Sequence, residues 1–333
     1  MPLRLFLTAT ALAASAIAVA ATRDDAVAAA KVELGRRLFY DADLSVDGTM
    51  ACATCHEQRR GFTDGNATHP GVTGEAGRRN VPGLANVAAR NALTWGDPRI
   101  RTLEAQAAVP LFGEHPVEMG MKRHEAEIGK RLGGDACYRA QFRAAFPESG
   151  AIDTAHVVTA LAAFQRTMIS RGAAYDRYRA GQQDALSAPQ RAGLRAFATH
   201  GCAACHSGAD LTDDRFHAIA PPVAGARDRG LAEVTGRAVD NGRFKTPALR
   251  NVAVSAPYLH DGSAATLGDA IRRHDAARGL DDATIAALTD FLTGLTDAAF
   301  LRDPRLSLPP PGCPRPLSPA AARDADRAAA RRG

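Results

Sequence analysis

Apolar side chains recur along the chain mostly with the spacing of helices. Each half ends in a segment whose apolar residues return every three or four positions and so share one helical face. These residues are Val157, Val158, Leu161, Phe164 and Met168 in the first half, and Ile285, Leu288, Phe291, Leu292 and Leu295 in the second. Strand-like alternation is scarce, and glycine and proline punctuate the stretches between helices. The pattern predicts an all-α protein with long loops.

The chain also contains an internal repeat. Gly35-Arg-Arg-Leu-Phe39 precedes Cys52-Ala-Thr-Cys55-His56, and Gly193-Leu-Arg-Ala-Phe197 precedes Cys202-Ala-Ala-Cys205-His206. The two cysteine motifs begin 150 residues apart (202 − 52), which is about one domain length. We therefore predict two domains of the same kind, over residues 21–171 and 187–315, joined near residues 172–186.

Both ends of the chain predict segments outside these domains. An apolar run from Leu5 to Ala21 follows Arg4, and Ala18-Val19-Ala20 within it has the form of a signal cleavage site. We expect a signal peptide over residues 1–20, cleaved on export to the periplasm, and no membrane span. The alternative is an uncleaved anchor, although the run is shorter than the ~20 residues that cross a bilayer. The basic segment over residues 316–333 predicts a disordered tail.

Composition argues against one class of partner. The formal charge of +5 is modest, and aromatic residues make up only 5% of the chain and are scattered. Proteins that bind single-stranded nucleic acid combine basic grooves with aromatic side chains on which bases stack. We therefore expect no nucleic-acid partner.

The two Cys-x-x-Cys-His motifs are the attachment signature of c-type haem. Two thiols reach the two vinyl groups of one porphyrin, and the adjacent histidine places an imidazole on the iron. A single copy could instead be a redox dithiol or a zinc site. Two equivalent copies in an exported chain favour two covalent haems, held by Cys52, Cys55 and His56 and by Cys202, Cys205 and His206.

The two remaining cysteines are Cys137 and Cys313. In an oxidising compartment they could form a disulfide that ties the C-terminal tail to the first domain. Two free buried thiols are the alternative, and the sequence leaves both open.

Further motifs carry a family resemblance. Leu38-Phe39-Tyr40-Asp41 precedes the first cysteine pair, and Thr246-Pro-Ala-Leu-Arg-Asn-Val252 is followed by Ala256-Pro-Tyr-Leu-His-Asp-Gly262. Together with the haem motifs, these segments resemble the bacterial dihaem cytochrome c peroxidase and MauG superfamily over nearly the whole mature chain. Leu93-Thr-Trp95 and residues 111–120 look closest to the MbnH-like dihaem enzymes.

The resemblance implies a haem peroxidase-type oxidoreductase with two cytochrome c-like domains. In this family one haem activates hydrogen peroxide and the other stores or relays an oxidising equivalent. MauG-like members oxidise residues on a partner protein, so we expect a high-valent dihaem state that oxidises a residue, with tryptophan as the expected target, on an exported partner. The alternatives are a conventional dihaem peroxidase, which draws electrons from a small cytochrome or cupredoxin, and a dihaem electron carrier without catalysis.

Near the first haem, the segment from Leu103 to Met119 resembles the family's distal segment. Glu118 matches its glutamate and Gln106 its glutamine. A carboxylate beside an open iron can take a proton from peroxide and return it to the leaving oxygen. This chain has two extra residues between Pro110 and Glu118, so the loop departs from the family pattern. The alternative is that Glu118 is an exposed loop carboxylate.

His69 and His115 are two further candidates to approach the first haem. In conventional dihaem peroxidases a loop histidine closes this iron until reduction opens it. His69 lies in a glycine-rich loop of suitable position, but its spacing to Arg79-Asn80 differs from that pattern. A solvated loop histidine is the alternative.

His274 falls where conventional peroxidases have an axial methionine and MauG has an axial tyrosine. Histidine is a strong haem ligand, and a pair of His206 and His274 would favour ferric iron more than a histidine–methionine pair does. The alternative is that His274 only decorates a helix while a methionine ligates. The chain has no methionine after Met168, so we predict His274 as the second axial ligand.

Trp95 is the only tryptophan of the chain. It matches the family tryptophan that lies between the two haems, where an indole can relay an oxidising equivalent, so we include it among the predicted catalytic residues. A lone tryptophan is otherwise more often part of a core. Tyr258 and His260 follow the family pattern near the second haem, where we expect packing and propionate hydrogen bonds.

The resemblance also implies one calcium ion between the domains. Asn80 matches its side-chain ligand, and Ser255 and Pro257 match the positions that supply backbone carbonyls. Oxygen ligands of this kind suit a hard cation.

Overall fold

The computed structural model describes residues 24–221 and 226–313 of the chain. After a helix over residues 24–39, its α-helices are α2 (Cys52–Cys55), α3 (Leu103–Phe112), α4 (Glu125–Gly134), α5 (Ala136–Ala145), α6 (Thr154–Gln165), α7 (Ala174–Arg179), α8 (Ala188–Thr199), α9 (Ala232–Thr235), α10 (Leu267–Arg272) and α11 (Asp282–Thr293). Short 3-10 helices are η1 (Ala42–Leu44), η2 (Gln58–Arg60), η3 (Val87–Ala89), η4 (Cys202–Ala204), η5 (Ala238–Asp240), η6 (Val252–Val254), η7 (Asp275–Ala277) and η8 (Phe300–Arg302).

The helix-rich class predicted from the sequence is confirmed. One departure from an all-α fold is a short antiparallel pair of β1 (Phe216–His217) and β2 (Phe244–Lys245). The predicted signal peptide (residues 1–20) and tail (residues 316–333) lie outside the described residues. Within the ranges that are described, no helix combines the length and apolarity that a membrane crossing requires.

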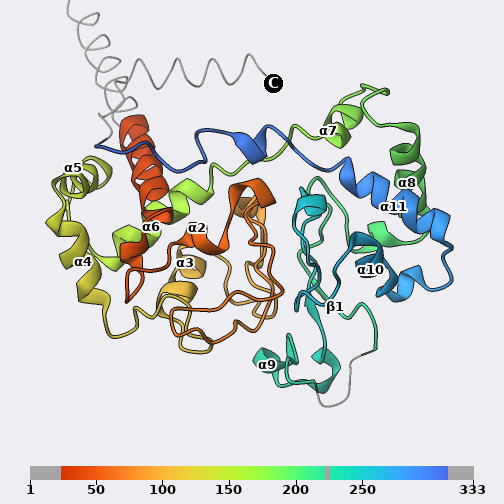
Figure 1. The fold of residues 1–333 in the computed structure, drawn as a ribbon, viewed down its shortest axis with the longest axis horizontal. Coiled ribbons are helices and arrows are strands. Elements are labelled where there is room, and N and C mark those ends of the chain that lie inside the picture. The colour runs from red at the N-terminus through yellow and green to blue at the C-terminus, as the bar shows by residue number, and fades with distance from the viewer. Residues whose placement is uncertain (1–23, 222–225, 314–333) are drawn as a thin grey trace, which may run out of the picture.

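Buried apolar side chains form two separate clusters. The first gathers residues between Leu34 and Met168 together with Phe300 and Leu306. The second gathers residues between Tyr175 and Leu295. Figure 1 shows the two halves side by side, with α3 to α6 on one side and α7, α8, α10 and α11 on the other. The domain boundaries themselves stay a prediction.

The repeated glycine and phenylalanine have a shared structural role. A Cβ added to Gly35 would lie 1.8 Å from the carbonyl oxygen of Ala160 in α6, and one added to Gly193 would lie 1.8 Å from that of Ala287 in α11. Only glycine lets the backbones of each helix pair approach this closely. One turn later, Phe39 packs at 5.4 Å from Phe164, and Phe197 packs at 5.2 Å from Phe291 (ring centroids). The repeat therefore encodes the same helix crossing in each half.

This crossing predicts a large effect of Gly193→Ala. The new methyl group would meet backbone, which cannot swing aside, so α8 and α11 must separate. We expect the free energy of unfolding to fall by about 3 kcal/mol, the upper end of the usual cost of overpacking, measured by denaturant unfolding of the haem-loaded protein. The control is Gly134→Ala at the end of α4, where an added Cβ meets nothing within 4 Å. An unchanged stability in Gly193→Ala would contradict the close crossing.

The C-terminal segment over residues 297–313, here called the strap, returns from the second half to the first. Gln58 donates to the carbonyl oxygens of Phe300 and Asp303 at 3.0 and 2.9 Å. The Tyr40 hydroxyl donates to the carbonyl of Leu306 at 2.7 Å. Figure 1 shows the strap crossing from α11 toward the N-terminal helix. The last part of the range predicted for the second domain thus packs on the first half.

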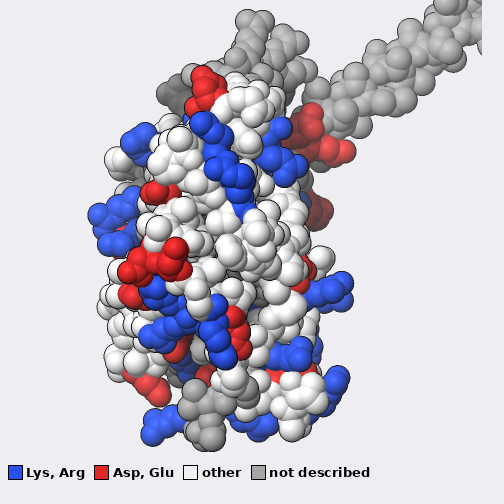
Figure 2. Space-filling view, turned by 90° about the vertical axis from the view of Figure 1, so that its right-hand side faces the viewer, with Lys and Arg blue, Asp and Glu red and all other residues white. Residues whose placement is uncertain are grey.

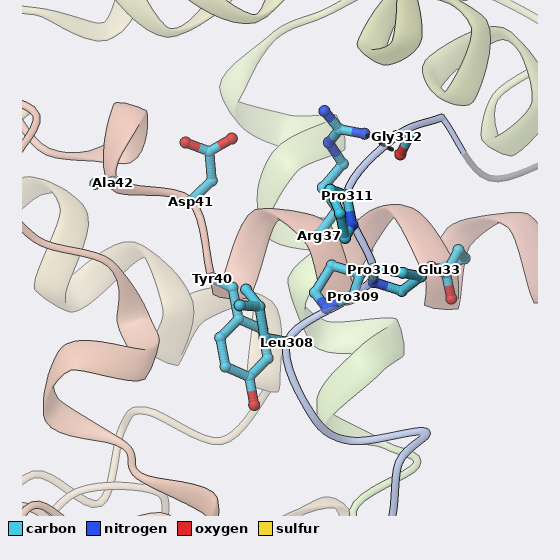
Figure 3. Close-up of a pocket in the computed structure, with 10 residues that line it drawn as sticks. All are labelled: Glu33, Arg37, Tyr40, Asp41, Ala42, Leu308, Pro309, Pro310, Pro311 and Gly312. Atoms are coloured by element: carbon cyan, nitrogen blue, oxygen red, sulfur yellow. Dashed lines mark hydrogen bonds between the residues drawn. The ribbon is translucent and has the colours of Figure 1, made fainter.

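A disulfide fastens the end of the strap. Cys137 of α5 is bonded to Cys313, as one of the two sequence alternatives predicted. Figure 3 shows the run from Pro309 to Pro311 beside the helix over residues 24–39, with the Arg37 side chain extending toward Gly312. The cavity between them has a volume of about 230 Å³ and contains none of the predicted site residues. The strap is therefore a covalent tie between the halves.

Loss of this tie is expected to lower stability markedly. The disulfide joins residues 176 positions apart, and its closure of so long a loop restricts the unfolded chain. Cys313→Ser should reduce the free energy of unfolding by about 2–5 kcal/mol, measured by thermal unfolding. Treating the parent protein with a reductant should produce the same loss, whereas the variant should no longer respond to reductant. A parent protein insensitive to reductant would refute the role of the bond.

Candidate haem sites

The first cysteine motif presents a histidine whose orientation is held by the backbone. Cys52 and Cys55 begin and end α2, and His56 follows directly. The Nδ1 of His56 lies 2.7 Å from the carbonyl oxygen of Phe62, so Nδ1 must carry the proton and donate it. Burial lowers the pKa of His56. The imidazole is therefore neutral near pH 7, and its Nε2 lone pair is available to a metal.

The second motif has the same arrangement. His206 follows Cys205, and its Nδ1 donates to the carbonyl oxygen of Leu211 at 3.0 Å. Burial lowers the pKa of His206 to about 4, although hydrogen bonds to the carbonyls of Leu211 and Pro247 oppose the shift. The ring of Phe197 lies 6.5 Å away, as that of Phe39 lies 6.3 Å from His56. Both motifs thus offer a neutral imidazole held by a backbone acceptor.

The acceptor residues belong to a part of the repeat that the sequence analysis missed. Phe62-Thr63-Asp64 and Leu211-Thr212-Asp213 follow the two motifs at similar spacing. Phe62 and Leu211 have φ of 66° and 54°, a left-handed conformation that bulky residues rarely adopt. Such backbone outliers concentrate at functional sites because the surrounding structure must enforce them. The recurring Thr-Asp pair was the available sequence signal.

His274 faces His206 at a distance that suits one metal between them. The centroids of the two rings are 6.5 Å apart. Two metal–nitrogen bonds of about 2.0–2.1 Å, each extended by about 1 Å to its ring centre, span roughly 6 Å. The Nδ1 of His274 donates to the carbonyl oxygen of Ala270 at 2.8 Å, which leaves Nε2 for coordination. The donor set therefore fits an iron with two axial imidazoles.

The first half has an equivalent helix that lacks this ligand. Thr266 caps α10 by accepting from the third residue after it, and Thr102 caps α3 in the same way. His274 is the eighth residue after the first cap, and Pro110 is the eighth after the second. Proline has no side-chain donor atom for a metal. The two halves therefore differ at this position, where only the second half offers a further imidazole.

Glu118 lies beside the first cysteine motif. Burial raises the pKa of Glu118, and a charge on nearby His69 opposes that rise. Burial also raises the pKa values of Cys52 and Cys55 to about 12, and the charge of Glu118 adds to both shifts. The amide of Val72 donates to the carbonyl of Glu118 at 2.8 Å, which fastens the segment to the loop that carries His69. Glu118 is thus a partly buried carboxylate of the site rather than an exposed loop residue.

Of the two loop histidines, only His69 is near this carboxylate. His69 affects the pKa values of both Glu118 and His56, whereas His115 is exposed. Gln106 precedes Pro110 by one turn of α3 and so shares its face of the helix. The carbonyl of Pro110 accepts from the amide of Met119, adjacent to Glu118. The fold therefore brings His69 and Glu118 close to the first motif, and the backbone hydrogen bond between Met119 and Pro110 joins the Glu118 segment to the helix that carries Gln106.

Trp95 joins the two halves through its backbone and its indole. Its Nε1 donates to the carbonyl of Asn80 at 2.8 Å, and its own carbonyl accepts from the amide of Lys245 at 2.9 Å. Asn80 and Lys245 occupy equivalent places, each two residues before the proline of a Pro-x-Leu-x-Asn-Val segment that begins at Pro82 or Pro247. Trp95 therefore lies at the junction between the halves.

The residues that match calcium ligands lie at the same junction. Asn80 is buried, and its Nδ2 donates to the carbonyls of Asn66 and Ala67. Its backbone amide donates to the carbonyl of His260 at 2.7 Å, which joins it to the loop after Ser255 and Pro257. The orientation of Nδ2 leaves the amide oxygen available, and carbonyl-rich loops suit calcium. The residues therefore fit the ion.

One further group of metal-binding side chains occurs in the described residues. Atoms of Cys205, Asp213 and His217 lie within 4.8 Å of one another. Cys205 is a predicted haem-attachment cysteine, and its sulfur would then be used as a thioether. We assign no separate metal to this group.

Known proteins of similar sequence support two haem sites in this chain. The profile of the family described as di-haem cytochrome c peroxidase matches residues 29–184. The chain is 37% identical over 238 residues to the methylamine utilization protein MauG of Methylorubrum extorquens, covering 71% of this chain and 66% of that protein. It is 35% identical over 246 residues to the cytochrome c551 peroxidase of Pseudomonas aeruginosa, covering 72% and 70%. The match spans about two thirds of the MauG relative.

Solved structures extend the comparison to the fold. A MauG-like protein associated with microbial copper homeostasis is 36% identical, with a TM-score of 0.79 over 84% of this chain and 93% of that one. The dihaem peroxidase BthA from Burkholderia thailandensis, at 24% identity and a TM-score of 0.66, shares the fold. The predicted class of haem-dependent oxidoreductase is confirmed at the level of the family. The chain belongs to the di-haem cytochrome c peroxidase family that includes MauG.

Proposed function

We propose that this chain is a periplasmic dihaem oxidoreductase that uses hydrogen peroxide to oxidise a residue, a tryptophan, on an exported partner protein. Cys52, Cys55 and His56 would hold one c-type haem, and Cys202, Cys205, His206 and His274 the other. The relatives include both MauG proteins and cytochrome c peroxidases. The choice between these activities therefore depends on the residues of this chain.

The difference between His274 and Pro110 carries the proposal. The second half offers two imidazoles to one iron, with ring centroids 6.5 Å apart. The first half has a proline at the equivalent position of α3, so one face there is left for peroxide. Two imidazole ligands lower the reduction potential relative to a histidine–methionine pair. A low reduction potential suits a haem that shares oxidising equivalents. It is less suited to a haem that must accept electrons from a small redox donor.

When bound, the haems supply the iron that reacts with peroxide and the redox centres that hold oxidising equivalents. Glu118 would act as the proton carrier, accepting the proton of peroxide and returning it to the leaving oxygen. Its partial burial raises its pKa, which brings the ionised and protonated forms closer in energy than in a solvent-exposed glutamate. Gln106 would orient peroxide from α3, and His69 would support the ionised form of Glu118.

Trp95 would connect the two centres. Hydrogen bonds to Asn80 and Lys245 hold it between the halves, and an indole in this place can be transiently oxidised. A calcium ion bound by Asn80, Ser255 and Pro257 would fix the same junction. Figure 2 shows acidic and basic side chains interspersed on one face of the molecule.

The proposal is tested by adding one equivalent of hydrogen peroxide to the diferric protein while recording its absorption spectrum. We expect one high-spin and one low-spin haem before addition, and spectral changes at both haems afterwards. In Trp95→Phe the change at the low-spin haem should be slowed or lost, while that at the high-spin haem persists. Two low-spin haems inert to peroxide would refute the proposal.

A second assay separates the proposal from a conventional peroxidase. A conventional enzyme would turn over rapidly with a reduced small cytochrome or cupredoxin after half-reduction. We expect turnover with such donors to be slow, and the diferric protein to react without prior reduction. Rapid donor-dependent turnover that requires half-reduction would favour the conventional activity. A spectrum unchanged by peroxide in every redox state would instead indicate an electron carrier.

A further inference from the structure

Lys245 is half-buried, and none of the described side chains pairs directly with its ammonium group. Its neighbour in β2, Phe244, stacks on His260 at 3.5 Å between ring centroids. Because successive side chains of a strand point to opposite faces, the Lys245 side chain points away from that stack. On this side of the strand, the charges of Asp214 and Arg90 influence the pKa of Lys245. Among the described residues, no hydrogen bond or ion pair reaches its Nζ within normal distance.

The groups around Lys245 are also incompletely satisfied. The Nε of Arg90 and the Oδ1 of Asp214 are buried and lack hydrogen-bond partners. The two Nη atoms of Arg90 are used by Asp210 and, at 3.5 Å, by Asp214. Burial lowers the pKa of Lys245 to about 8, which Asp214 opposes and Arg90 reinforces. A half-buried ammonium without a partner and an unused buried N–H of Arg90 together indicate that an anion belongs here.

The location of Lys245 indicates which anion this is. Its amide is bonded to the carbonyl of Trp95, and two residues later the Pro247 carbonyl contacts the ring of His206. Lys245 thus lies between the interdomain tryptophan and the second cysteine motif. A c-type haem held by that motif brings two carboxylates of its own, its propionates. No carboxylate of the described protein side chains supplies the direct contact that Lys245 lacks.

We propose that Lys245 binds a propionate carboxylate of the second haem, with Arg90 Nε as a second donor. The inference rests on the two haems of the proposed function. A cation held near the iron favours the reduced state, which carries one less positive charge. Lys245 is therefore a positioning residue that anchors the haem beside Trp95 and raises the reduction potential of the second haem.

The test is a potentiometric titration of each haem in the full-length, haem-loaded protein. In Lys245→Met we expect the reduction equilibrium of the low-spin haem to shift about tenfold toward the ferric form, which is about 59 mV for one electron. The high-spin haem should shift less than twofold. Lys245→Arg keeps the charge and should restore the low-spin potential to within about twofold. The control is Lys130→Met, whose side chain in α4 is 78% exposed.

Each outcome decides the proposal. An unchanged low-spin potential in Lys245→Met, or an equal shift in Lys245→Arg, would overturn it, and so would a shift confined to the high-spin haem. Lys245→Gln is measured alongside, and failure of both neutral variants to retain two haems would also overturn it, because a propionate contact tunes a haem that thioethers already attach. A parent protein with fewer than two haems would refute the proposed function instead, so the two failures are distinguishable.

Discussion

Alanine at position 274 is expected to convert the second haem from low spin to high spin. The rings of His274 and His206 have centroids 6.5 Å apart, so both would hold the iron of the second haem. Removing one of two axial imidazoles leaves a five-coordinate iron, as in haem proteins with a single proximal histidine. His274→Ala should therefore lose the low-spin signal entirely and show two high-spin haems per protein, measured by electron paramagnetic resonance and absorption spectroscopy.

The control for this variant lies in the same half of the protein. His200, at the C-terminal end of α8, precedes the second cysteine motif and is absent from the proposed ligand set. His200→Ala should keep one low-spin haem. A low-spin signal that survived in His274→Ala would show that another residue ligates the iron. The asymmetry between the two halves would then lose its structural basis.

Glutamine at position 118 is expected to slow the reaction with peroxide by about 10²–10⁴-fold, the usual contribution of general acid–base catalysis. Glutamine keeps the size and polarity of Glu118 but cannot accept or return a proton. The second-order rate constant for peroxide, measured by stopped-flow absorption, should therefore fall, while the resting spectra of both haems stay unchanged. Retention of the parent rate would exclude Glu118 as the proton carrier.

The same residue predicts a pH dependence. Glu118 must be ionised to accept the proton of peroxide, so the rate of the parent protein should fall as the pH drops through the pKa of Glu118. Burial raises that pKa above its ordinary value, which moves the acid limb to higher pH. The limb should be absent in Glu118→Gln. The matched control is Glu114→Gln, because Glu114 is exposed and pairs only with exposed Arg123 among the described residues.

Much of the fold was predictable from local pattern. The helical spacing from Val157 and from Ile285 corresponds to α6 and α11, although these helices end at Gln165 and Thr293, so that Met168 and Leu295 are buried just beyond them. The Gly-x-x-x-Phe repeats mark the helices that cross them, because glycine permits the approach and phenylalanine fills the next turn. The Thr-Asp and Pro-x-Leu-x-Asn-Val repeats were also present in the sequence, but the sequence analysis did not identify them. They would have revealed the carbonyls that hold His56 and His206 and the equivalence of Asn80 and Lys245.

The sequence by itself determined the two cysteine motifs and the helix-rich class, because residue spacing and helical faces are properties of local residue order. The assignment of His274 as a ligand stays a prediction, based on the family position that it matches and the absence of a later methionine. Only the tertiary structure decided that His69 lies near Glu118, that Cys137 pairs with Cys313, and that Lys245 has no partner among the described residues. These facts depend on contacts between segments distant in sequence. Residue order alone does not specify such distances, because they arise only when the two cores pack and the strap returns to the first half.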